Sequence, residues 1–489
     1  QIMVDGEWED FFIKGVNIGS STPGKWFTQF ETSEEVYLEW FELIAEMNAN
    51  TIRVYTLLPP QFYTAFVYYN EAHPDKPLWL YQEIWPEENP EDDDYLKVEY
   101  NEEYLKEIEN VIDALNGHAN IPYRKGRAYG IYTSDVSPYL AGYLVGRELE
   151  PEEVESTNEL NEGYTYDGEY LYCAADASPT EAWLAMSCDY VLIYEAQAYN
   201  WQHPVGIVSW PTLDVAEHDS EWNEEGDKDK EYNDRVSVDI NNIEVKDTLA
   251  TGFFGAYHIY PNYPDFMNNE EKYALYEDDE GVFRYGGYLQ EFMETHTKYP
   301  ALVAEFGLAT GNSSAHSNPD GYDHGGMTEI EQGEGIVRML EAIKEENYAG
   351  GIIFEWTDEW AKKTWTTEPY IIPYERNVLW HNTSDPEQNY GIFAMEAGDA
   401  VSDEYLLDGE GAIEQLSLIA DEEYLYVQIT LEEEIDFENE NLIIGLDTVS
   451  REAGERKYAE DIDEYTPFGL EFVININDYG DAEILAEPE

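Results

Sequence analysis

Eight short segments rich in β-branched and aromatic residues recur between residues 11 and 356 of the chain, and stretches with helical periodicity separate most of them. Strands that are apolar along their length and alternate with helices are typical of a parallel sheet covered on both faces. The alternation therefore predicts the α/β class. The eight segments are Phe11–Ile18, Asn50–Thr56, Leu78–Ile84, Leu140–Glu148, Val205–Trp210, Gly252–Tyr260, Ala301–Phe306 and Gly350–Trp356.

Two α/β folds fit this alternation, a closed (β/α)8 barrel and an open doubly wound sheet. Eight strand–helix units within residues 1–396 favour the barrel, with long loops. A dinucleotide-binding doubly wound sheet carries GxGxxG after its first strand, and GVNIGSSTPG at residues 15–24 lacks this spacing. We therefore predict a TIM barrel, in which chemistry takes place at the C-terminal ends of the strands.

Four helices are predicted from apolar residues that recur with a period near 3.6. Ser33 and Ser178 precede two of them and suit the N-cap position, where a hydroxyl accepts a hydrogen bond from a free backbone N–H. The predicted helices are Glu34–Met47, Glu102–Leu115, Pro179–Tyr199 and Glu329–Asn347.

The pattern changes after residue 396, where strand-like segments are joined by acidic turns without a helical period. Such a succession is typical of a β-sandwich. We predict a barrel domain at residues 1–396 and a small or truncated β-sandwich module at residues 397–489. The predicted strands of the module are Leu416–Ala420, Tyr424–Leu431, Leu442–Asp447 and Gly469–Ile476.

Acidic residues outnumber basic ones by 106 to 25, which gives a formal charge of −81. A phosphate backbone and an anionic membrane surface both require a basic partner, so nucleic acid and charged membranes are excluded. The chain is nevertheless expected to fold, because 43% apolar and 15% aromatic residues supply a large core. No apolar run approaches the ~20 residues of a membrane span.

Two explanations of the charge remain open. Concentrated salt would screen it while the carboxylates hold water and cations; alternatively, a secreted or cell-surface protein would use it to bind divalent cations or to repel its neighbours. The chain begins at Gln1, so a processed start is expected, and we predict an extracellular or cell-surface location. Cys173 and Cys188 are too few for a disulfide framework and are expected to be free thiols.

Two glutamates stand at predicted strand ends. Glu148 ends the fourth strand, and Glu305 lies in the apolar seventh strand, ALVAEF, where a buried carboxyl is costly unless it is paired or functional. Carboxyls on opposite sides of a barrel mouth can cleave a glycosidic bond, one as general acid and the other as nucleophile. The alternative is that both only satisfy neighbouring groups, and Glu150, Glu152 and Glu153 lie close to the first.

Supporting groups are expected at other strand ends. Arg53 ends the second strand and is suited to keep the nucleophile ionised. Tyr257, His258 and Tyr260 end the sixth strand, and Trp356 ends the eighth, where it would form the floor under a sugar ring. Ordinary packing is the alternative for each. Aromatic residues that suit the C–H faces of sugars also follow the strands, namely Trp26, Phe27, Trp85, Trp210, Tyr263, Trp360 and Trp365.

The loop after the seventh strand contains His316, Asp320, Asp323 and His324 within HSNPDGYDHGG. A Gly-rich loop with these side chains could bind Ca²⁺ or a transition metal, but their spacing matches no established ligand set. We expect an ordinary loop here, and we expect neither a metal nor a cofactor in the protein.

The motifs FFIKGVNIG, MNANTIRVYTLLPPQFY, YLVGRELEPEEVESTN, LVAEFGLATG and YAGGIIFEWTDEW resemble, in this order, bacterial and archaeal (β/α)8 proteins related to glycoside hydrolase families 2 and 5. The resemblance covers residues 1–396. It implies a clan A-type glycosidase with a retaining mechanism, Glu148 as general acid/base and Glu305 as nucleophile. The clan's other site positions correspond to Arg53, to Tyr257 or His258, and to Trp356.

One position departs from that clan, which usually has Asn immediately before the acid/base. Here the residue is Arg147, and a guanidinium pairs with carboxylates and sulfates, so Arg147 predicts binding of an anionic sugar substituent such as a uronic carboxylate. In the C-terminal part, SLIADEEYLYVQITL and LIIGLDTVS resemble family 9 carbohydrate-binding modules.

The sequence thus predicts a retaining glycoside hydrolase or transglycosylase that acts on an extracellular polysaccharide. The alternative is a non-catalytic protein that binds glycan or assembles into a cell-surface layer, and Arg147 and the extreme charge favour it. The two differ in whether Glu148 and Glu305 face each other across an open cleft with Arg53 beside Glu305. The sequence leaves the oligomeric state open.

The acidic surface generates a prediction about salt. We expect the fold to loosen when NaCl falls from molar to millimolar concentration, because screening then no longer limits the repulsion among carboxylates. The melting temperature, followed by circular dichroism at both concentrations, measures this. Equal melting temperatures would contradict the view that the surface is adapted to salt.

Overall fold

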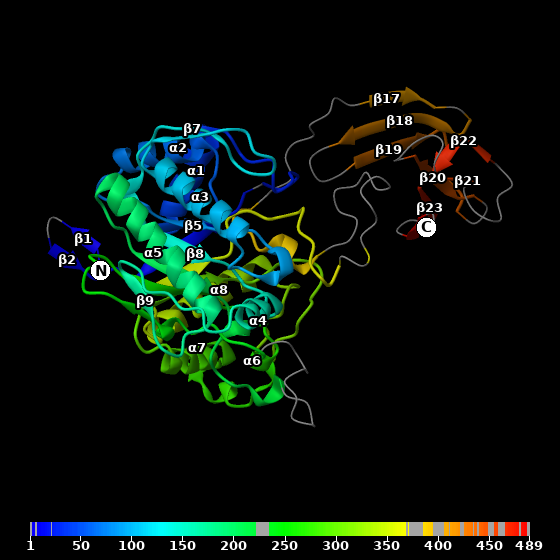
Figure 1. The fold of residues 1–489 in the computed structure, drawn as a ribbon. Coiled ribbons are helices and arrows are strands. Elements are labelled where there is room, and N and C mark those ends of the chain that lie inside the picture. The colour runs from blue at the N-terminus through cyan, green and yellow to red at the C-terminus, as the bar shows by residue number, and fades with distance from the viewer. Residues whose placement is uncertain are drawn as a thin grey trace. The chain divides into compact units, whose positions relative to one another are not determined.

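The structure is a computed structural model of the chain, drawn as a ribbon in Figure 1. It divides into two compact units, residues 1–368 with 384–393 and residues 369–383 with 394–489. The predicted boundary between residues 396 and 397 lies outside the described residues. The structure describes residues 2–4, 7–20, 22–221, 234–367, 370, 385–394, 405–409, 411–420, 425–433, 435–437, 440–447, 454–457, 465–478 and 481–486.

Eight parallel strands of the first unit close into a barrel, which confirms the predicted TIM-barrel fold (Figure 1). The strands follow one another around the barrel in chain order, and the last pairs with the first. Each lies within one of the eight predicted segments. They are β3 (Ile13–Ile18), β4 (Thr51–Val54), β5 (Trp79–Ile84), β8 (Leu140–Gly146), β10 (Val205–Ser209), β12 (Phe253–His258), β15 (Ala301–Phe306) and β16 (Gly350–Ile353).

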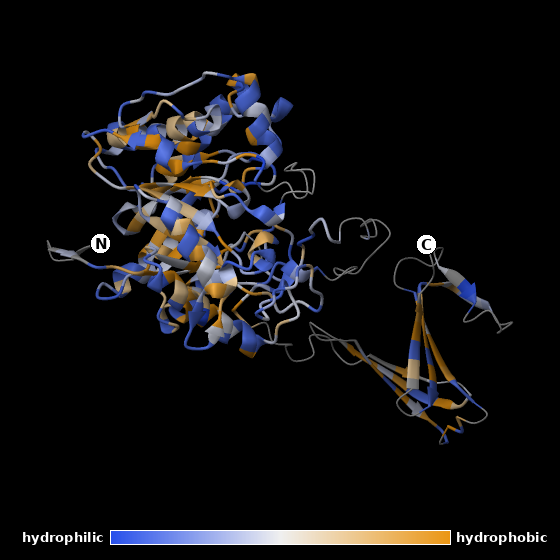
Figure 2. Ribbon diagram, turned by 90° about the horizontal axis from the view of Figure 1, so that it is seen from below, coloured by the Kyte–Doolittle hydropathy of each residue, from blue (hydrophilic) through white to orange (hydrophobic). Residues whose placement is uncertain are grey.

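Both faces of the barrel strands are buried, which explains why the segments are apolar throughout. Figure 2 shows these strands as largely hydrophobic, while the surrounding helices carry hydrophilic residues. Val16, Ile52 and Val303 are among the residues that face the helices. The side chains inside the barrel are Ile13, Tyr81, Leu144, Val208, Phe254, Ala256, Leu302, Ala304 and Ile352.

All four predicted helices are present, and both serine caps are confirmed: Ser33 accepts from the N–H of Val36, and Ser178 from that of Glu181. Three further helices, α2, α4 and α7, were not predicted from the sequence. The first is dense in aromatics, the second has only Val154 and Leu160 as large apolar residues, and the third contains a Gly pair, all of which blur an apolar stripe. The helices are α1 (Glu34–Glu46), α2 (Pro60–Ala72), α3 (Val98–Leu115), α4 (Pro151–Leu160), α5 (Pro179–Tyr199), α6 (Phe266–Asn269), α7 (Arg284–Thr295) and α8 (Glu329–Glu345).

Short two-stranded sheets decorate the first unit. Within the described part of the chain, no helix has the length and apolarity that a membrane crossing requires. The short strands are β1 (Ile2–Val4), β2 (Glu7–Glu9), β6 (Ala119–Ile121), β7 (Gly130–Tyr132), β9 (Leu171–Cys173), β11 (Ile243–Val245), β13 (Glu277–Asp278) and β14 (Gly281–Val282).

The second unit consists of antiparallel sheets, as a β-sandwich module requires. Two of the sheets have three strands each, in the orders β17-β18-β19 and β20-β23-β24, and a third pairs β21 with β22. Tyr424, the predicted start of one strand, lies outside the described residues. The strands are β17 (Tyr405–Asp408), β18 (Ile413–Ala420), β19 (Leu425–Leu431), β20 (Leu442–Leu446), β21 (Glu455–Lys457), β22 (Tyr465–Leu470), β23 (Phe472–Asp478) and β24 (Asp481–Ala486).

Candidate active site

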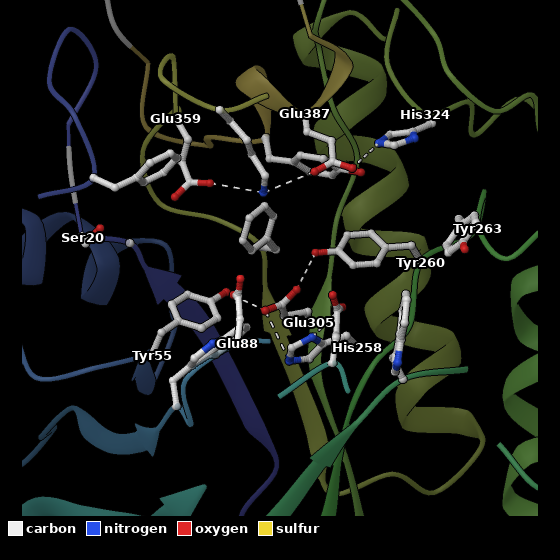
Figure 3. A pocket seen from close by; sticks show the side chains of 18 of the residues that line it. Ser20, Tyr55, Glu88, His258, Tyr260, Tyr263, Glu305, His324, Glu359 and Glu387 are labelled. Atoms are coloured by element: carbon white, nitrogen blue, oxygen red, sulfur yellow. Dashed lines mark hydrogen bonds and ion pairs between the residues drawn. The ribbon is translucent and has the colours of Figure 1, made fainter. Parts of the chain in front are cut away.

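A cavity of about 530 Å³ opens at the C-terminal ends of the barrel strands (Figure 3). Glu148 and Glu305 both line it, together with residues from the loops that follow the other strands. Its wall combines aromatic rings, on which sugars can stack, with many polar and charged side chains, five of them glutamates. The aromatic residues are Phe27, Tyr55, Trp85, Trp210, Tyr260, Tyr263, Phe354, Trp365 and Tyr390.

Glu305 points into this cavity because β15 contains a β-bulge. Val303 pairs with Gly351 of β16, and Phe306 pairs with Ile353. Between these two pairs β15 advances by three residues and β16 by only two, so β15 contains one extra residue. An extra residue in one strand lets two successive side chains face the same side. Glu305 therefore turns toward the barrel mouth although Ala304, its neighbour, already faces the interior.

Three side chains hold the Glu305 carboxylate. Arg53 donates from Nη1 to Oε1 over 3.0 Å, the Tyr55 hydroxyl donates to Oε1 over 2.7 Å, and the Tyr260 hydroxyl donates to Oε2 over 2.8 Å. Glu305 as a whole is 6% exposed, so these bonds replace the water that its carboxylate lost on burial. The predicted position of Arg53 beside Glu305 is thus what the structure shows.

These contacts decide the protonation of Glu305. Burial by itself raises its pKa, but the charge of His258 when protonated, the guanidinium of Arg53 and the two tyrosine hydroxyls together lower the pKa of Glu305 below its ordinary value. The group is therefore ionised at neutral pH. An ionised carboxylate with little solvent is suited to act as a nucleophile.

Arg53 also binds a second buried glutamate, Glu83, which sequence reasoning missed. Its Nε donates to Glu83 Oε2 over 2.9 Å, and both side chains are fully buried. Burial raises the pKa of Glu83 to about 7 against the opposing charge of Arg53. The signal was available, because Glu83 interrupts the apolar segment LWLYQEI as Glu305 interrupts ALVAEF.

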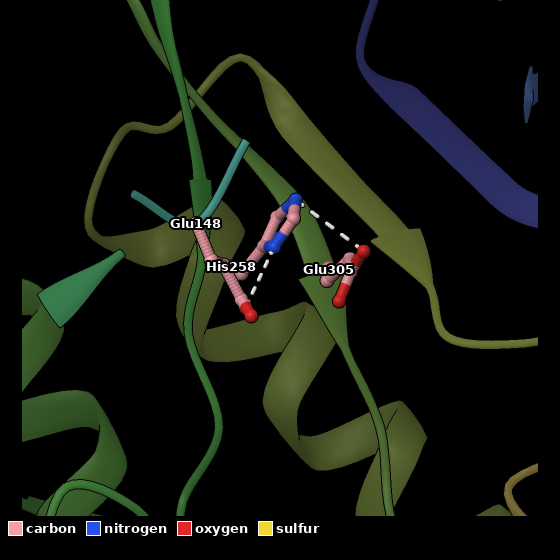
Figure 4. A group of neighbouring side chains, drawn as sticks. All are labelled: Glu148, His258 and Glu305. Atoms are coloured by element: carbon pink, nitrogen blue, oxygen red, sulfur yellow. Dashed lines mark hydrogen bonds and ion pairs between the residues drawn. The ribbon is translucent and has the colours of Figure 1, made fainter. Parts of the chain in front are cut away.

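His258 lies between the two predicted catalytic glutamates (Figure 4). Its Nδ1 is 2.8 Å from Glu148 Oε1, and its Nε2 is 3.3 Å from Glu305 Oε1. Arg53 Nη2 is only 2.9 Å from the same Nε2. A guanidinium can only donate, so Nε2 accepts and the ring proton sits on Nδ1, which donates to Glu148.

The imidazole sets the spacing of the pair. One carboxyl oxygen of Glu148, one of Glu305 and a ring nitrogen of His258 all lie within 4.8 Å of one another. The two acids differ in environment, because the Glu148 side chain is 36% exposed and that of Glu305 only 8%. Glu148 can therefore exchange protons with solvent or substrate while Glu305 stays shielded.

Arg147 does not line the cavity, so its predicted contact with an anionic sugar is wrong. The chain turns at Gly146, which has a φ of 107°, a value that glycine adopts without steric cost. After this turn the side chain of Arg147 lies outside the cavity. Its guanidinium donates to both carboxylate oxygens of Glu153 over 2.9 and 2.7 Å and to the Glu148 carbonyl over 2.8 Å. Arg147 thus fixes the backbone of Glu148 against the start of α4.

Two predicted aromatic residues also lie outside the cavity. Side chains alternate along β12, so Tyr257 faces the helices and its hydroxyl lies 3.2 Å from His296 Nδ1, while its neighbour His258 faces the mouth. Trp356 is buried against the Phe393 ring, at a centroid distance of 5.1 Å. Phe354 lines the cavity in its place. Trp210 and Tyr260 line the cavity as expected.

Lys362 is a cationic cavity residue that sequence reasoning did not single out. Its Nζ lies 3.3 Å from Glu359 Oε2 and 3.3 Å from Glu387 Oε2, and it stands over the Phe354 ring. Both carboxylates also line the cavity (Figure 3). Nothing in the motif that contains Lys362 distinguishes it from an ordinary surface lysine.

The four side chains of the loop after β15 do not converge on one point. Asp320 pairs with Arg284, and His316 Nδ1 lies 3.0 Å from Asp265 Oδ1. In the described residues, potential metal ligands gather within 4.8 Å in two places, Glu148 with His258 and Glu305, and Asp214 with His218 and Asp234.

No known protein-family model matches the sequence, and neither does any curated protein. Solved structures with some likeness include an endo-laminarinase from Formosa Hel1_33_131, with 12% identity and a TM-score of 0.44 over 78% of this chain and 83% of that one. A Rhizomucor miehei β-1,3-glucanosyltransferase mutant with laminaritriose has 11% identity and a TM-score of 0.37, over 78% and 92%. A GH5-4 endoglucanase from Ruminococcus champanellensis has 10% identity and a TM-score of 0.33, over 72% of this chain and 89% of that one. At such identities the likeness concerns the fold alone.

The charge balance around Arg53 yields a stability prediction. Arg53→Met should lower the free energy of unfolding at pH 7 by about 3–5 kcal/mol, because Glu305 would stay buried without its cation, while Glu83, whose pKa is already raised to about 7, would take up a proton. The loss should shrink toward pH 5, since the unpaired Glu305 carboxyl then takes up a proton and loses its charge. Urea denaturation at both pH values measures this.

A matched control is Arg127→Met. Arg127 pairs with Glu87 at the surface, where both side chains are at least one-third exposed, so its loss should cost about 0–1 kcal/mol. Equal losses for the two variants at pH 7 would show that the buried pair has no special role in stability.

Proposed function

We propose that the barrel is a retaining glycoside hydrolase or transglycosylase that acts on an extracellular polysaccharide. The observation that carries this is the spacing of the pair, with carboxyl oxygens of Glu148 and Glu305 within 4.8 Å at the floor of an aromatic cavity. Retaining enzymes hold their carboxyls about 5–5.5 Å apart, whereas inverting enzymes leave about 6.5–9.5 Å for a water molecule. Carboxyls whose nearest oxygens lie within 4.8 Å fit the retaining arrangement, which proceeds through a covalent intermediate.

The environments assign the two roles. Glu305, ionised and held by Arg53, Tyr55 and Tyr260, attacks the anomeric carbon while Glu148 gives its proton to the departing glycosidic oxygen. Glu148, now ionised, takes a proton from water or from a sugar hydroxyl, and that oxygen displaces Glu305. The first acceptor gives hydrolysis and the second gives transfer.

His258 positions the acid/base during both steps. Its Nδ1–H bond holds Glu148 Oε1 toward the nucleophile, and the Arg53 contact at Nε2 fixes the tautomer that can donate this bond. His258 is not placed to take the proton of the leaving group, because its two ring nitrogens already face Glu148 and Arg53. It is a positioning residue.

The convergent pair bears on the alternative of a non-catalytic glycan-binding or surface-layer protein. A blocked or divergent pair would favour that alternative, but Glu148 and Glu305 line one open cavity. Arg147, whose presence favoured it, is engaged with Glu153 instead of the cavity. The geometry therefore supports catalysis.

The roles can be separated by substitution. With any glycan substrate found by screening, Glu305→Gln should abolish turnover, and Glu148→Ala should lower kcat by about 10²–10⁴-fold, the usual contribution of general acid catalysis. For an activated aryl glycoside, azide should restore turnover of Glu148→Ala and give a glycosyl azide with retained configuration. Azide should give the inverted product with Glu305→Ala.

Glu150→Gln is the matched control, because Glu150 lies two residues from Glu148 but does not line the cavity. Its turnover should stay near that of the parent protein. Unchanged activity of Glu305→Gln, or identical products from the two azide reactions, would contradict the assignment.

The hydrogen bonds to Glu305 predict a pH effect. Tyr55→Phe removes a hydroxyl that helps to lower the pKa of Glu305, so this pKa should rise. The acid limb of the kcat/KM profile should then move to higher pH, because the nucleophile becomes protonated earlier as pH falls. Tyr63→Phe, a buried tyrosine bound to Gln82 away from Glu305, should leave the limb in place. A shift in the control of the same size would contradict this.

A further inference from the structure

A second cluster of titratable side chains, Asp214, His218 and Asp234, lies outside the catalytic pair. One potential ligand atom from each residue lies within 4.8 Å of the other two. The side chains are almost without solvent, because that of His218 is 0% exposed and those of the two aspartates are 2% exposed. None of the three is among the residues that line the cavity, and the proposed function leaves them without a task.

Asp234 orients the imidazole of His218. The backbone N–H of His218 donates to Asp234 Oδ2 over 2.6 Å, and the ring Nδ1 lies 2.7 Å from Oδ1. An ionised carboxylate can only accept, so Nδ1 carries the proton and Nε2 of the neutral ring keeps a free lone pair. Histidines that bind metals are commonly held in this way, by a carboxylate at the other ring nitrogen.

The free nitrogen of His218 points toward Asp214. Among the described residues, Nε2 has no hydrogen-bond partner, and it lies 3.9 Å from Asp214 Oδ2. This separation is too long for a hydrogen bond, but an ion about 2.0–2.2 Å from each atom would fit between them. A buried nitrogen without a partner costs free energy, and a bound ion would remove that cost.

Asp214 is fixed in the direction of this nitrogen. Its Oδ2 accepts from the Tyr288 hydroxyl over 2.7 Å, and its Oδ1 accepts from the N–H of Ala216 over 2.9 Å. A carboxylate oxygen has two lone pairs, so Oδ2 can also bind an ion. Within the described part of the chain, no lysine or arginine pairs with Asp214 or Asp234. A cation would therefore compensate two buried carboxylates.

We propose that Asp214 and His218 bind a divalent transition-metal ion such as Zn²⁺, with Asp234 as the positioning residue behind His218. An imidazole nitrogen beside a carboxylate oxygen suits such ions, whereas Ca²⁺ and Mg²⁺ take oxygen ligands. Water molecules complete the coordination. The site departs from the expectation, drawn from the sequence, that the protein holds no metal.

The place of the cluster gives the ion a structural role. Asp214 follows Trp210 and Pro211 in the loop after β10, and both of these residues line the cavity. Asp214 bonds to Tyr288 of α7, and the His218 ring stacks on Phe266 of α6 at a centroid distance of 3.5 Å. An ion between Asp214 and His218 would thus fasten the loop that carries part of the cavity wall.

Zinc titration of the whole chain, after a chelator has removed any bound metal, tests this proposal. Millimolar Mg²⁺ in every solution occupies the surface carboxylates, so calorimetry reports sites that prefer Zn²⁺. We expect one saturable site per chain and a higher melting temperature with Zn²⁺, because an ion that binds only the folded state stabilises it. X-ray absorption of the zinc-loaded protein should show imidazole nitrogen and oxygen ligands at about 2.0–2.2 Å.

Substitutions assign the site to its residues. His218→Gln should abolish saturable binding, and so should Asp214→Asn, which keeps the shape of the side chain. Asp234→Asn should weaken the affinity for Zn²⁺ by about 10–100-fold, the usual effect of removing a group that orients a metal ligand. Circular dichroism and the melting temperature without Zn²⁺ show whether each variant is folded.

His316→Gln and His258→Gln are the matched controls. His316 forms a similar pair with Asp265 over 3.0 Å, but it belongs to none of the clusters of three potential ligands in the described residues. His258 belongs to the other such cluster, where its two ring nitrogens already face Glu148 and Arg53. Both variants should bind Zn²⁺ as the parent protein does.

The outcomes are distinct from those of the catalytic assignment, because zinc binding is measured without turnover. Loss of binding in His218→Gln with binding retained in both controls supports the site. Absence of saturable binding by the parent protein overturns it, as does binding that survives His218→Gln or is lost in His258→Gln. If a variant fails to fold, the absorption spectrum of the parent protein decides, and a spectrum without imidazole ligands overturns the proposal.

Discussion

One buried guanidinium joins the mouth-side ends of five barrel strands. Arg53 of β4 contacts Asn17 of β3, Glu83 of β5, His258 of β12 and Glu305 of β15. A cation without solvent needs acceptors on all sides, so these strands must meet around it for the barrel to close. The position and ionisation of Glu305, and the tautomer of His258, follow from that requirement.

The site differs in charge from the rest of the protein. Acidic residues outnumber basic ones about fourfold in the chain, yet the centre of the site is organised by Arg53, with Lys362 bridging Glu359 and Glu387 at the cavity wall. Because Glu305, Glu359 and Glu387 are each paired with a cation, the cavity can hold them close together. The overall negative charge thus governs how the protein surface interacts with salt and water. At the cavity, Arg53 and Lys362 determine the local electrostatic potential.

Helices and strands could be predicted from the sequence where burial imposed a clear apolar pattern on them. Strands buried on both faces gave continuous apolar runs, and all eight were found. Helices with a clear stripe and a serine cap, such as α1 and α5, were found as well. α4 was missed because Val154 and Leu160 are its only large apolar residues and form no stripe, yet it carries Glu153, which holds Arg147 away from the cavity. Glu153, the partner of Arg147, was thus outside every predicted element.

The sequence by itself determined the barrel and the placement of acids at the ends of the fourth and seventh strands, because apolar runs and their ends are local properties. Only the tertiary structure decided which neighbour faces the cavity: Glu148 and not Arg147, His258 and not Tyr257, Phe354 and not Trp356. In a strand a shift of one residue moves a side chain to the other face. The glycine turn after β8, the alternation along β12 and the bulge in β15 set that choice, and they depend on pairing with distant strands.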